Sequence, residues 1–295
     1  MAKHFLVTIS NDVDNLFGVQ FLCSFFQAMA QCQVTLFHIC RLDAPDMKAE
    51  LLKMWDGPSD GIEGYVSIGA RNSLDKATRL LQERRMHVDQ MITKTVAERG
   101  GKVRDILAEG SRGLYDAIVL GRRASYTLQW LVERPADEIA QGLIRDHTCT
   151  LPLWICPRID PQRRGVLVCL DGSEHAYRAA DHVGYILAGQ AHQPVTLLQV
   201  TSVPGSGDEA VFDRAVGILQ RHGIEDERIE RRAVWGLSVA GSILSEAEKG
   251  GYAAVAVGFG GSGAASGETS SFRLLGGTTS RLICKNEITS LWCCP

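Results

Sequence analysis

The sequence predicts an α/β protein made of two tandem five-stranded parallel-sheet units, on the basis of three observations. The motif Leu-Trp-x-Cys-Pro occurs twice, at residues 153–157 and 291–295, so it closes each half of the 295-residue chain. Two further pairs of segments resemble each other: 34–39 with 195–200, and 117–121 with 254–258. In both halves short β-branched apolar runs alternate with longer amphipathic stretches, which is typical of βαβ units. Such an internal repeat indicates two copies of one fold.

The elements are expected in the same order in both halves. In the first half, strands are predicted at residues 5–9, 34–40, 92–96, 117–120 and 153–156. In the second half, strands are predicted at residues 165–170, 195–200, 229–234, 253–257 and 290–294. Helical spacing predicts helices at residues 174–187, 209–222 and 278–286, and one more through Val239, Ile243, Leu244 and Ala247.

The two halves differ in length at one place. Residue 34 matches residue 195, an offset of 161, whereas residue 153 matches residue 291, an offset of 138. The difference indicates an insertion within residues 43–79, centred on the turn-forming residues 54–61. We expect this insertion to be a solvent-exposed loop. With a polar linker at residues 158–164, we predict domains at 1–157 and 158–295.

Composition excludes several functional classes. The chain has 45% hydrophobic and 22% charged residues, an ordinary globular balance. A net charge of -3 argues against binding to nucleic acid, which requires a strongly basic face. No apolar run approaches the roughly 20 residues of a membrane helix, and residues 5–9 are too few for a signal peptide. The nine cysteines show no CxxC spacing, so we expect buried, reduced thiols in a cytoplasmic protein.

Glycine-rich segments follow the fourth strand of the second half. Residues 258–263 read Gly-Phe-Gly-Gly-Ser-Gly, and residues 276–280 read Gly-Gly-Thr-Thr-Ser at the start of a helix. Glycines let the backbone approach phosphate, and amides at a helix start attract anions. No carboxylate lies between Thr278 and Asn286 to repel phosphate. These segments indicate a phosphate site, although a surface tether is an alternative for the Gly/Ala/Ser-rich residues 262–271. Neither a Rossmann fingerprint nor a Walker loop fits, because the glycines follow a fourth strand and Gly-Lys-Ser/Thr is absent.

The opening of the second half adds a resemblance. Residues 166–174 read Val-Leu-Val-Cys-Leu-Asp-Gly-Ser-Glu before a helix, and the later order is strand, Gly-x-x-Gly loop, Gly-Ser/Thr, helix, final strand. This resembles the universal stress protein family, and the resemblance covers both halves. It implies the adenine-nucleotide alpha-hydrolase-like sandwich, ATP as ligand, with or without Mg²⁺, and halves related by a pseudo-twofold axis and paired through their last strands.

The same resemblance implies a set of nucleotide-binding residues. Asp171 matches the family aspartate on the ribose and adenine side, and Val200 matches the adenine-facing position. Gly258 and Gly261 match the first glycine pair, and Gly276, Gly277 and Thr278 match the phosphate-binding helix start. The site as a whole comprises Leu170, Asp171, Val200, Val257, Gly258, Phe259, Gly261, Gly276, Gly277, Thr278 and Thr279.

The spacing of these glycines departs from the family pattern. Fourteen residues separate Gly261 from Gly276 where the family has nine, and Gly277 replaces the usual serine or threonine. An alternative alignment keeps the family spacing by using Gly267, with Ala264 in place of the first glycine. In either alignment the loop is longer than the family's.

The first half is interpreted as a degenerate copy without nucleotide. Its loop at residues 121–126 keeps one glycine, and the following helix is expected to begin at residues 134–138, Arg-Pro-Ala-Asp-Glu. Acidic residues at a helix start stabilise it and repel phosphate. Ser10, Asn11 and Asp12 replace Asp-Gly-Ser. Arg122 and Arg123 are expected to be solvated surface charges, with an anion site as the alternative. The role left to this half is architectural, because antiparallel pairing of the two Leu-Trp-x-Cys-Pro strands would cover two sheet edges.

The leading functional hypothesis is a stress-response or regulatory protein that binds ATP in its second half. One alternative is a slow ATPase or phosphoryl-transfer enzyme. Its candidate catalytic residues are few, namely Asp171, Glu268 and Arg273. The other is a nucleotide-free interaction module. His175 and His182 are expected on a helix surface. The expected partners are an adenine nucleotide and an unidentified protein, with no nucleic acid, metal or membrane, and homodimerisation is left open.

Overall fold

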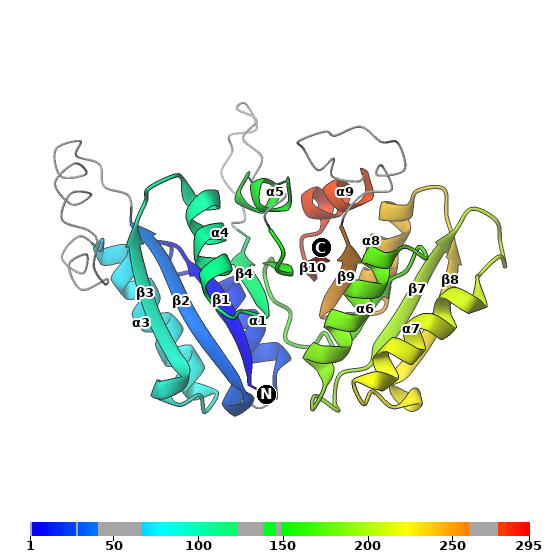
Figure 1. The fold of residues 1–295 in the computed structure, drawn as a ribbon, viewed down its shortest axis with the longest axis horizontal. Helices are drawn as coiled ribbons and strands as arrows, with labels where there is room; N and C mark the ends of the chain where they lie inside the picture. The colour runs from blue at the N-terminus through cyan, green and yellow to red at the C-terminus, as the bar shows by residue number, and fades with distance from the viewer. Residues whose placement is uncertain (1, 28, 41–65, 123–137, 146–148, 260–276) are drawn as a thin grey trace.

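A single ten-stranded sheet forms the centre of the protein. The computed structural model describes residues 2–27, 29–40, 66–122, 138–145, 149–259 and 277–295. The described strands follow the order β3-β2-β1-β4-β5-β10-β9-β6-β7-β8, so each half supplies one side of the sheet (Figure 1). The predicted fold class is confirmed.

The elements of the two halves follow the predicted order. The first half contains β1 (Lys3–Ile9), α1 (Phe17–Phe25), β2 (Cys32–Cys40), α3 (Ile68–Glu83), β3 (Met91–Ala97), α4 (Lys102–Arg112), β4 (Ala117–Gly121), α5 (Glu138–Arg145) and β5 (Leu153–Cys156). The second half contains β6 (Val166–Cys169), α6 (Glu174–Leu187), β7 (Val195–Thr201), α7 (Glu209–Arg221), β8 (Ile229–Trp235), α8 (Val239–Lys249), β9 (Ala254–Gly258), α9 (Gly277–Lys285) and β10 (Ser290–Cys294). Short 3-10 turns precede three strands, at Met29–Gln31, Val88–Gln90 and Asp226–Arg228.

The halves meet through their last strands. Strands run parallel within each half, whereas β5 and β10 pair antiparallel with Trp154 opposite Trp292. This is the predicted pairing, and it leaves only β3 and β8 as edges of the sheet in the described part of the chain. Because both central strands carry the Leu-Trp-x-Cys motif, their buried faces match each other across the pseudo-twofold axis.

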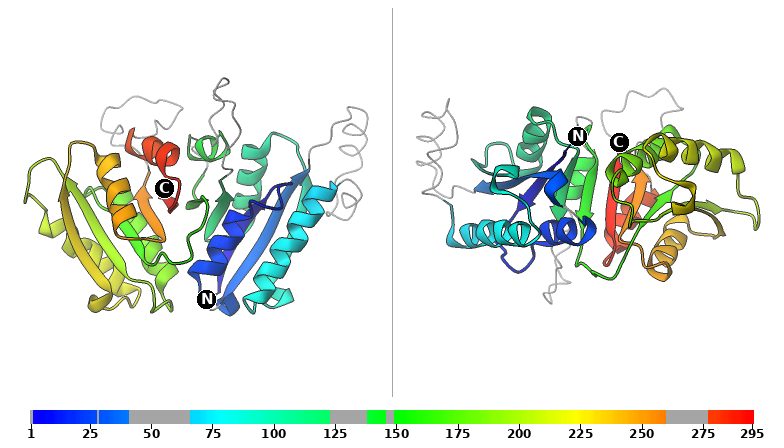
Figure 2. Two further views of the ribbon diagram at one scale, coloured as in Figure 1. Left: turned by 180° about the vertical axis from the view of Figure 1, so that it is seen from behind. Right: turned by 90° about the horizontal axis from the view of Figure 1, so that it is seen from below.

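Helices cover both faces of the sheet in two layers (Figure 2). One core cluster packs α1, α3, α6 and α7 against the face that carries Trp154 and Trp292. The other packs α4, α5, α8 and α9 against the face that carries Leu153 and Leu291. The strands are therefore buried on both faces, which explains their continuous apolar runs.

Side-chain caps explain where several helices begin. Ser67, Ser173 and Ser238 each accept a hydrogen bond from the amide three residues later, at 3.1, 3.2 and 3.2 Å. Asp208 accepts from the Ala210 amide at the start of α7. These caps satisfy amides that a helix start leaves without an intrahelical partner.

The predicted insertion falls before α3. The end of β2 at Cys40 and the end of β7 at Thr201 keep the offset of 161, whereas Glu83 and Arg221, which end α3 and α7, show the offset of 138. Residues 41–65, which include the predicted centre at 54–61, lie outside the described residues.

Candidate functional site

The carboxyl ends of three parallel strands of the second half lie side by side. They form the carboxyl-terminal edge of the sheet, which is distinct from its outermost strands β3 and β8. β6 lies between β9 and β7, so the segments that follow these strands are neighbours. Leu170 is buried, and its amide donates to the Leu198 carbonyl at 2.8 Å. Asp171 is exposed and Val200 is half-buried. Ligands of open parallel sheets bind at such an edge.

Asp171 sits in a turn that starts α6. Its Oδ1 accepts from the Ser173 amide at 3.0 Å, and Ser173 then caps the helix. Gly172 has φ +80°, a backbone conformation that residues other than glycine rarely adopt. The Asp-Gly-Ser opening therefore has a local structural reason, and it leaves the Asp171 side chain open to solvent at the sheet edge.

Gly258 is required by close packing. A Cβ at this position would lie 2.3 Å from the His175 carbonyl carbon and 2.6 Å from the Ala176 nitrogen. The end of β9 therefore contacts the backbone of the first turn of α6. At the matching position of the first half, a Cβ on Gly121 would meet its nearest atoms at 3.5 Å, an ordinary contact. The glycine that was predicted for phosphate thus also allows the strand and helix to meet.

The residues that flank Gly258 belong to the core. Val257 is 5% exposed and Phe259 is 4% exposed, and the Phe259 amide donates to the Cys294 carbonyl at 2.7 Å. Their side chains, like that of Leu170, pack in the core beneath the carboxyl ends of the strands and do not line the surface there.

The first turn of α9 is not covered by the described residues. Gly277 is exposed, and a Cβ there would meet no atom of the described part of the chain within 4 Å. Thr278 is half-buried, Thr279 is buried, and the first turn contains no acidic residue. The amides of a helix start and the positive end of its dipole attract anions. Gly261 and Gly276 lie outside the described residues, as do Glu268 and Arg273.

Arg122 has a role that sequence reasoning missed. Its guanidinium donates to the Cys284 carbonyl at 3.1 Å and to the Asn286 carbonyl, at the carboxyl end of α9. The expectation of a solvated surface charge was therefore wrong. No local signal reveals this contact, because the residues are more than 160 positions apart.

His182 was also interpreted incorrectly. It lies between the halves, where its Nε2 accepts from the indole Nε1 of Trp154 at 3.0 Å and its ring contacts Trp292 edge-on. Burial lowers the pKa of His182 to about 3, against the opposing effect of Asp181. The histidine is therefore a neutral interface residue, while His175, half-buried in the first turn of α6, contacts the end of β9.

The first half uses its corresponding turn for internal contacts. Asp12 accepts from the Asn15 side chain at 2.6 Å and from the Asp14 amide at 3.2 Å. The Asn11 carbonyl lies so close to α3 that a Cβ on Gly69 would be 2.8 Å from it. Of the predicted acidic helix start, residues 134–137 lie outside the described part, and α5 begins at Glu138.

The described part of the chain shows neither a metal site nor a membrane-spanning helix. Among the described residues, no group of three or more His, Cys, Asp or Glu side chains is placed to hold a metal ion. In the same part of the chain, no helix has the length and apolar character needed to span a membrane.

Comparisons with known proteins agree with this architecture. Residues 162–285 match the model of the Universal stress protein family. A universal stress protein from Archaeoglobus fulgidus DSM 4304 superposes with a TM-score of 0.66 at 17% identity, covering 100% of this chain and 98% of that chain. A putative universal stress protein from Pseudomonas aeruginosa UCBPP-PA14 gives a TM-score of 0.54 at 16% identity, over 99% and 93% of the two chains. No curated protein sequence matches the chain.

The fold defines the chain as an α/β protein whose mostly parallel sheet is covered on both faces. Its second half, over residues 162–285, matches the universal stress protein family, and the whole chain shares the fold of a solved universal stress protein.

Proposed function

We propose that the protein is a cytoplasmic stress-response protein that binds ATP, with or without Mg²⁺, in its second half, and that bound nucleotide favours one conformation or partner. The observation that carries the proposal is the open first turn of α9, free of acidic residues, beside an edge that presents Asp171 and Val200. The match of residues 162–285 to the universal stress protein family adds support.

The described residues fit a nucleotide chemically. Asp171 offers an exposed carboxylate to ribose hydroxyls, and half-buried Val200 offers an apolar surface to the base. The first amides of α9 and the Thr278 hydroxyl would donate to phosphate oxygens. We further propose that the first half, residues 1–157, is a degenerate domain of the same family that binds no nucleotide.

The test is the stoichiometry and the thermal effect of ATP. Equilibrium dialysis should find at most one nucleotide per chain, and millimolar ATP should raise the melting temperature because a ligand that binds only the native state stabilises it. Gly277→Val should abolish the shift, since its side chain fills space that the described residues leave open at the start of α9. Gly217→Val in α7 is the matched control, because a Cβ there also meets nothing within 4 Å. An unchanged melting curve for the wild type would reject the proposal.

A further inference from the structure

The first half reaches the far end of the helix that carries the proposed phosphate site. Arg122 directly follows β4, and its amide donates to the Cys156 carbonyl at 2.7 Å, which fixes its backbone beside β5. From there its guanidinium donates to the Cys284 and Asn286 carbonyls of α9 and the turn after it. These carbonyls are among those that a helix end leaves without an intrahelical partner.

The end of α9 that Arg122 holds is also bonded to Thr289, the residue directly before β10. The Asn286 side chain donates to the Thr289 carbonyl at 2.5 Å and accepts from the Thr289 amide at 3.2 Å. Leu282 and Ile283 anchor the helix in the core. α9 has only nine residues, and helices of this length are marginal by themselves. Its order and position therefore depend on contacts like that of Arg122.

The two ends of α9 are linked electrostatically. A cation at the carboxyl end and an anion at the amino end both stabilise the helical state through the macrodipole. When two groups both bind the same state of one helix, each raises the affinity of the other, and the effect is reciprocal.

We propose that Arg122 is a positioning residue, supplied by the first half, that holds α9 so that its first amides are ordered for phosphate. The inference rests on the proposed function of the second half. Reciprocally, nucleotide on α9 strengthens the contact between the halves. Among the described residues, the second half has no equivalent contact onto the first half. The position that matches Arg122 there is Phe259, which is buried in the core.

The experiment measures ATP affinity by calorimetry in the full chain. Arg122→Ala should weaken binding roughly five- to tenfold, and Arg122→Lys should recover part of the loss because it keeps the charge. The control is Lys3→Met, which removes a cross-half contact from a different helix: Lys3 is buried and donates to the Ala188 carbonyl after α6 at 3.0 Å. Lys3→Met should leave the affinity for ATP unchanged.

A second measurement separates positioning from loss of stability. In the wild type, ATP should slow amide hydrogen exchange in α9 and also in β4 and β5 of the first half. In Arg122→Ala, the slowing in β4 and β5 should disappear. Equal ATP affinity of Arg122→Ala and wild type would overturn this inference alone. Equal weakening by Lys3→Met would also overturn it, since the effect would then be general stability. Absence of binding to the wild type would reject the proposed function, and this inference with it.

Discussion

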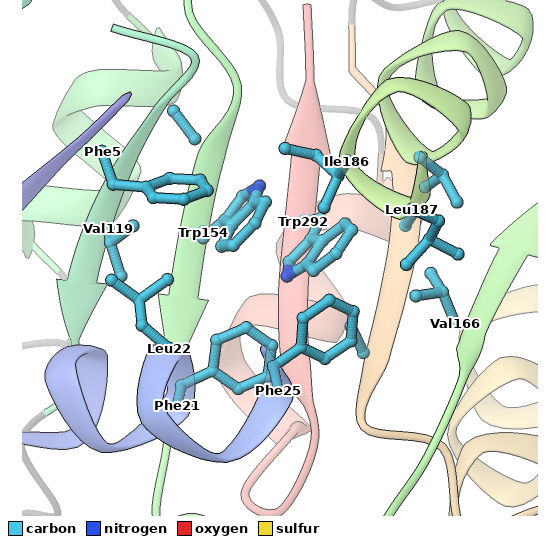
Figure 3. Close-up of a cluster of buried hydrophobic side chains, with 14 of the residues drawn as sticks. Phe5, Phe21, Leu22, Phe25, Val119, Trp154, Val166, Ile186, Leu187 and Trp292 are labelled. Atoms are coloured by element: carbon cyan, nitrogen blue, oxygen red, sulfur yellow. The ribbon is translucent and has the colours of Figure 1, made fainter. Parts of the chain in front are cut away.

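The indole Nε1 of Trp154 donates a hydrogen bond to Nε2 of His182 (3.0 Å), which joins the last strand of the first half to a helix of the second. The Trp154 ring stacks on Trp292 with centroids 4.0 Å apart and an interplanar angle of 3° (Figure 3). Nε1 of Trp292 is buried and has no hydrogen-bond partner among the described residues.

The pseudo-twofold axis explains this difference. Position 21 matches position 182 with the offset of 161, and Phe21 contacts both tryptophans edge-on, at 5.9 and 6.2 Å, as His182 does at 5.8 and 6.0 Å. Phenylalanine has no acceptor nitrogen, so only one of the two buried indoles is satisfied by its ring neighbour. The centre of the interface is symmetric in shape and asymmetric in hydrogen bonding.

His182→Phe should lower the free energy of unfolding by about 1–3 kcal/mol, because it leaves a second buried indole N–H without an acceptor. Urea denaturation followed by tryptophan fluorescence measures the change. The double variant with Phe21→His moves the acceptor to Trp292 and should be less destabilised than the sum of the single variants. Wild-type stability of His182→Phe would show that the hydrogen bond contributes nothing.

Acid should destabilise the protein partly through His182. Burial lowers the pKa of this residue to about 3 in the folded protein, whereas an unfolded histidine titrates near 6.5. Between these values the unfolded chain binds more protons, so the stabilisation present above pH 6.5 is lost as the pH falls toward 3. The contribution approaches about 1.4 kcal/mol per pH unit. Unfolding free energies of wild type and His182→Phe measured from pH 7 to pH 4 should therefore converge, and parallel curves would contradict the assignment.

Gly258→Ala should destabilise the protein by about 1–3 kcal/mol, because the new Cβ would overlap the backbone of α6 at 2.3 Å. Gly121→Ala is the matched control and should change stability by less than about 0.5 kcal/mol, since its Cβ meets ordinary contacts at 3.5 Å. Thermal denaturation of both variants without nucleotide checks this. Equal effects would mean that the two strand ends are packed alike.

Thr278→Glu should abolish ATP binding without loss of stability. A carboxylate in the first turn of α9 favours the helix dipole by about 0.3–1 kcal/mol but repels phosphate. Thr278→Gln is the control, with a similar shape and no charge, and should retain binding. Melting temperatures with and without ATP give both quantities. Binding by Thr278→Glu equal to that of Thr278→Gln would place the phosphates elsewhere.

Much of the fold follows from local patterns. The apolar runs predicted the strands of both halves and helical spacing predicted the helices of the second half, while the repeated Leu-Trp-x-Cys-Pro motif predicted the antiparallel pair of β5 and β10. Strand and helix periodicities are encoded by neighbouring residues, so the sequence shows them directly. The candidate nucleotide site was also predicted from the sequence, because strand ends and helix starts are local features, and it stays a prediction.

The sequence by itself determined the repeat, the layered α/β architecture, the family of the second half and the absence of acidic residues from the first turn of α9. Only the tertiary structure decided that Arg122 holds the other end of that helix, that His182 satisfies Trp154 and not Trp292, and that Gly258 lies against α6. The physical reason is that these contacts join residues from 28 to more than 160 positions apart. A residue's own neighbours in sequence carry no record of the partner that folding brings to it.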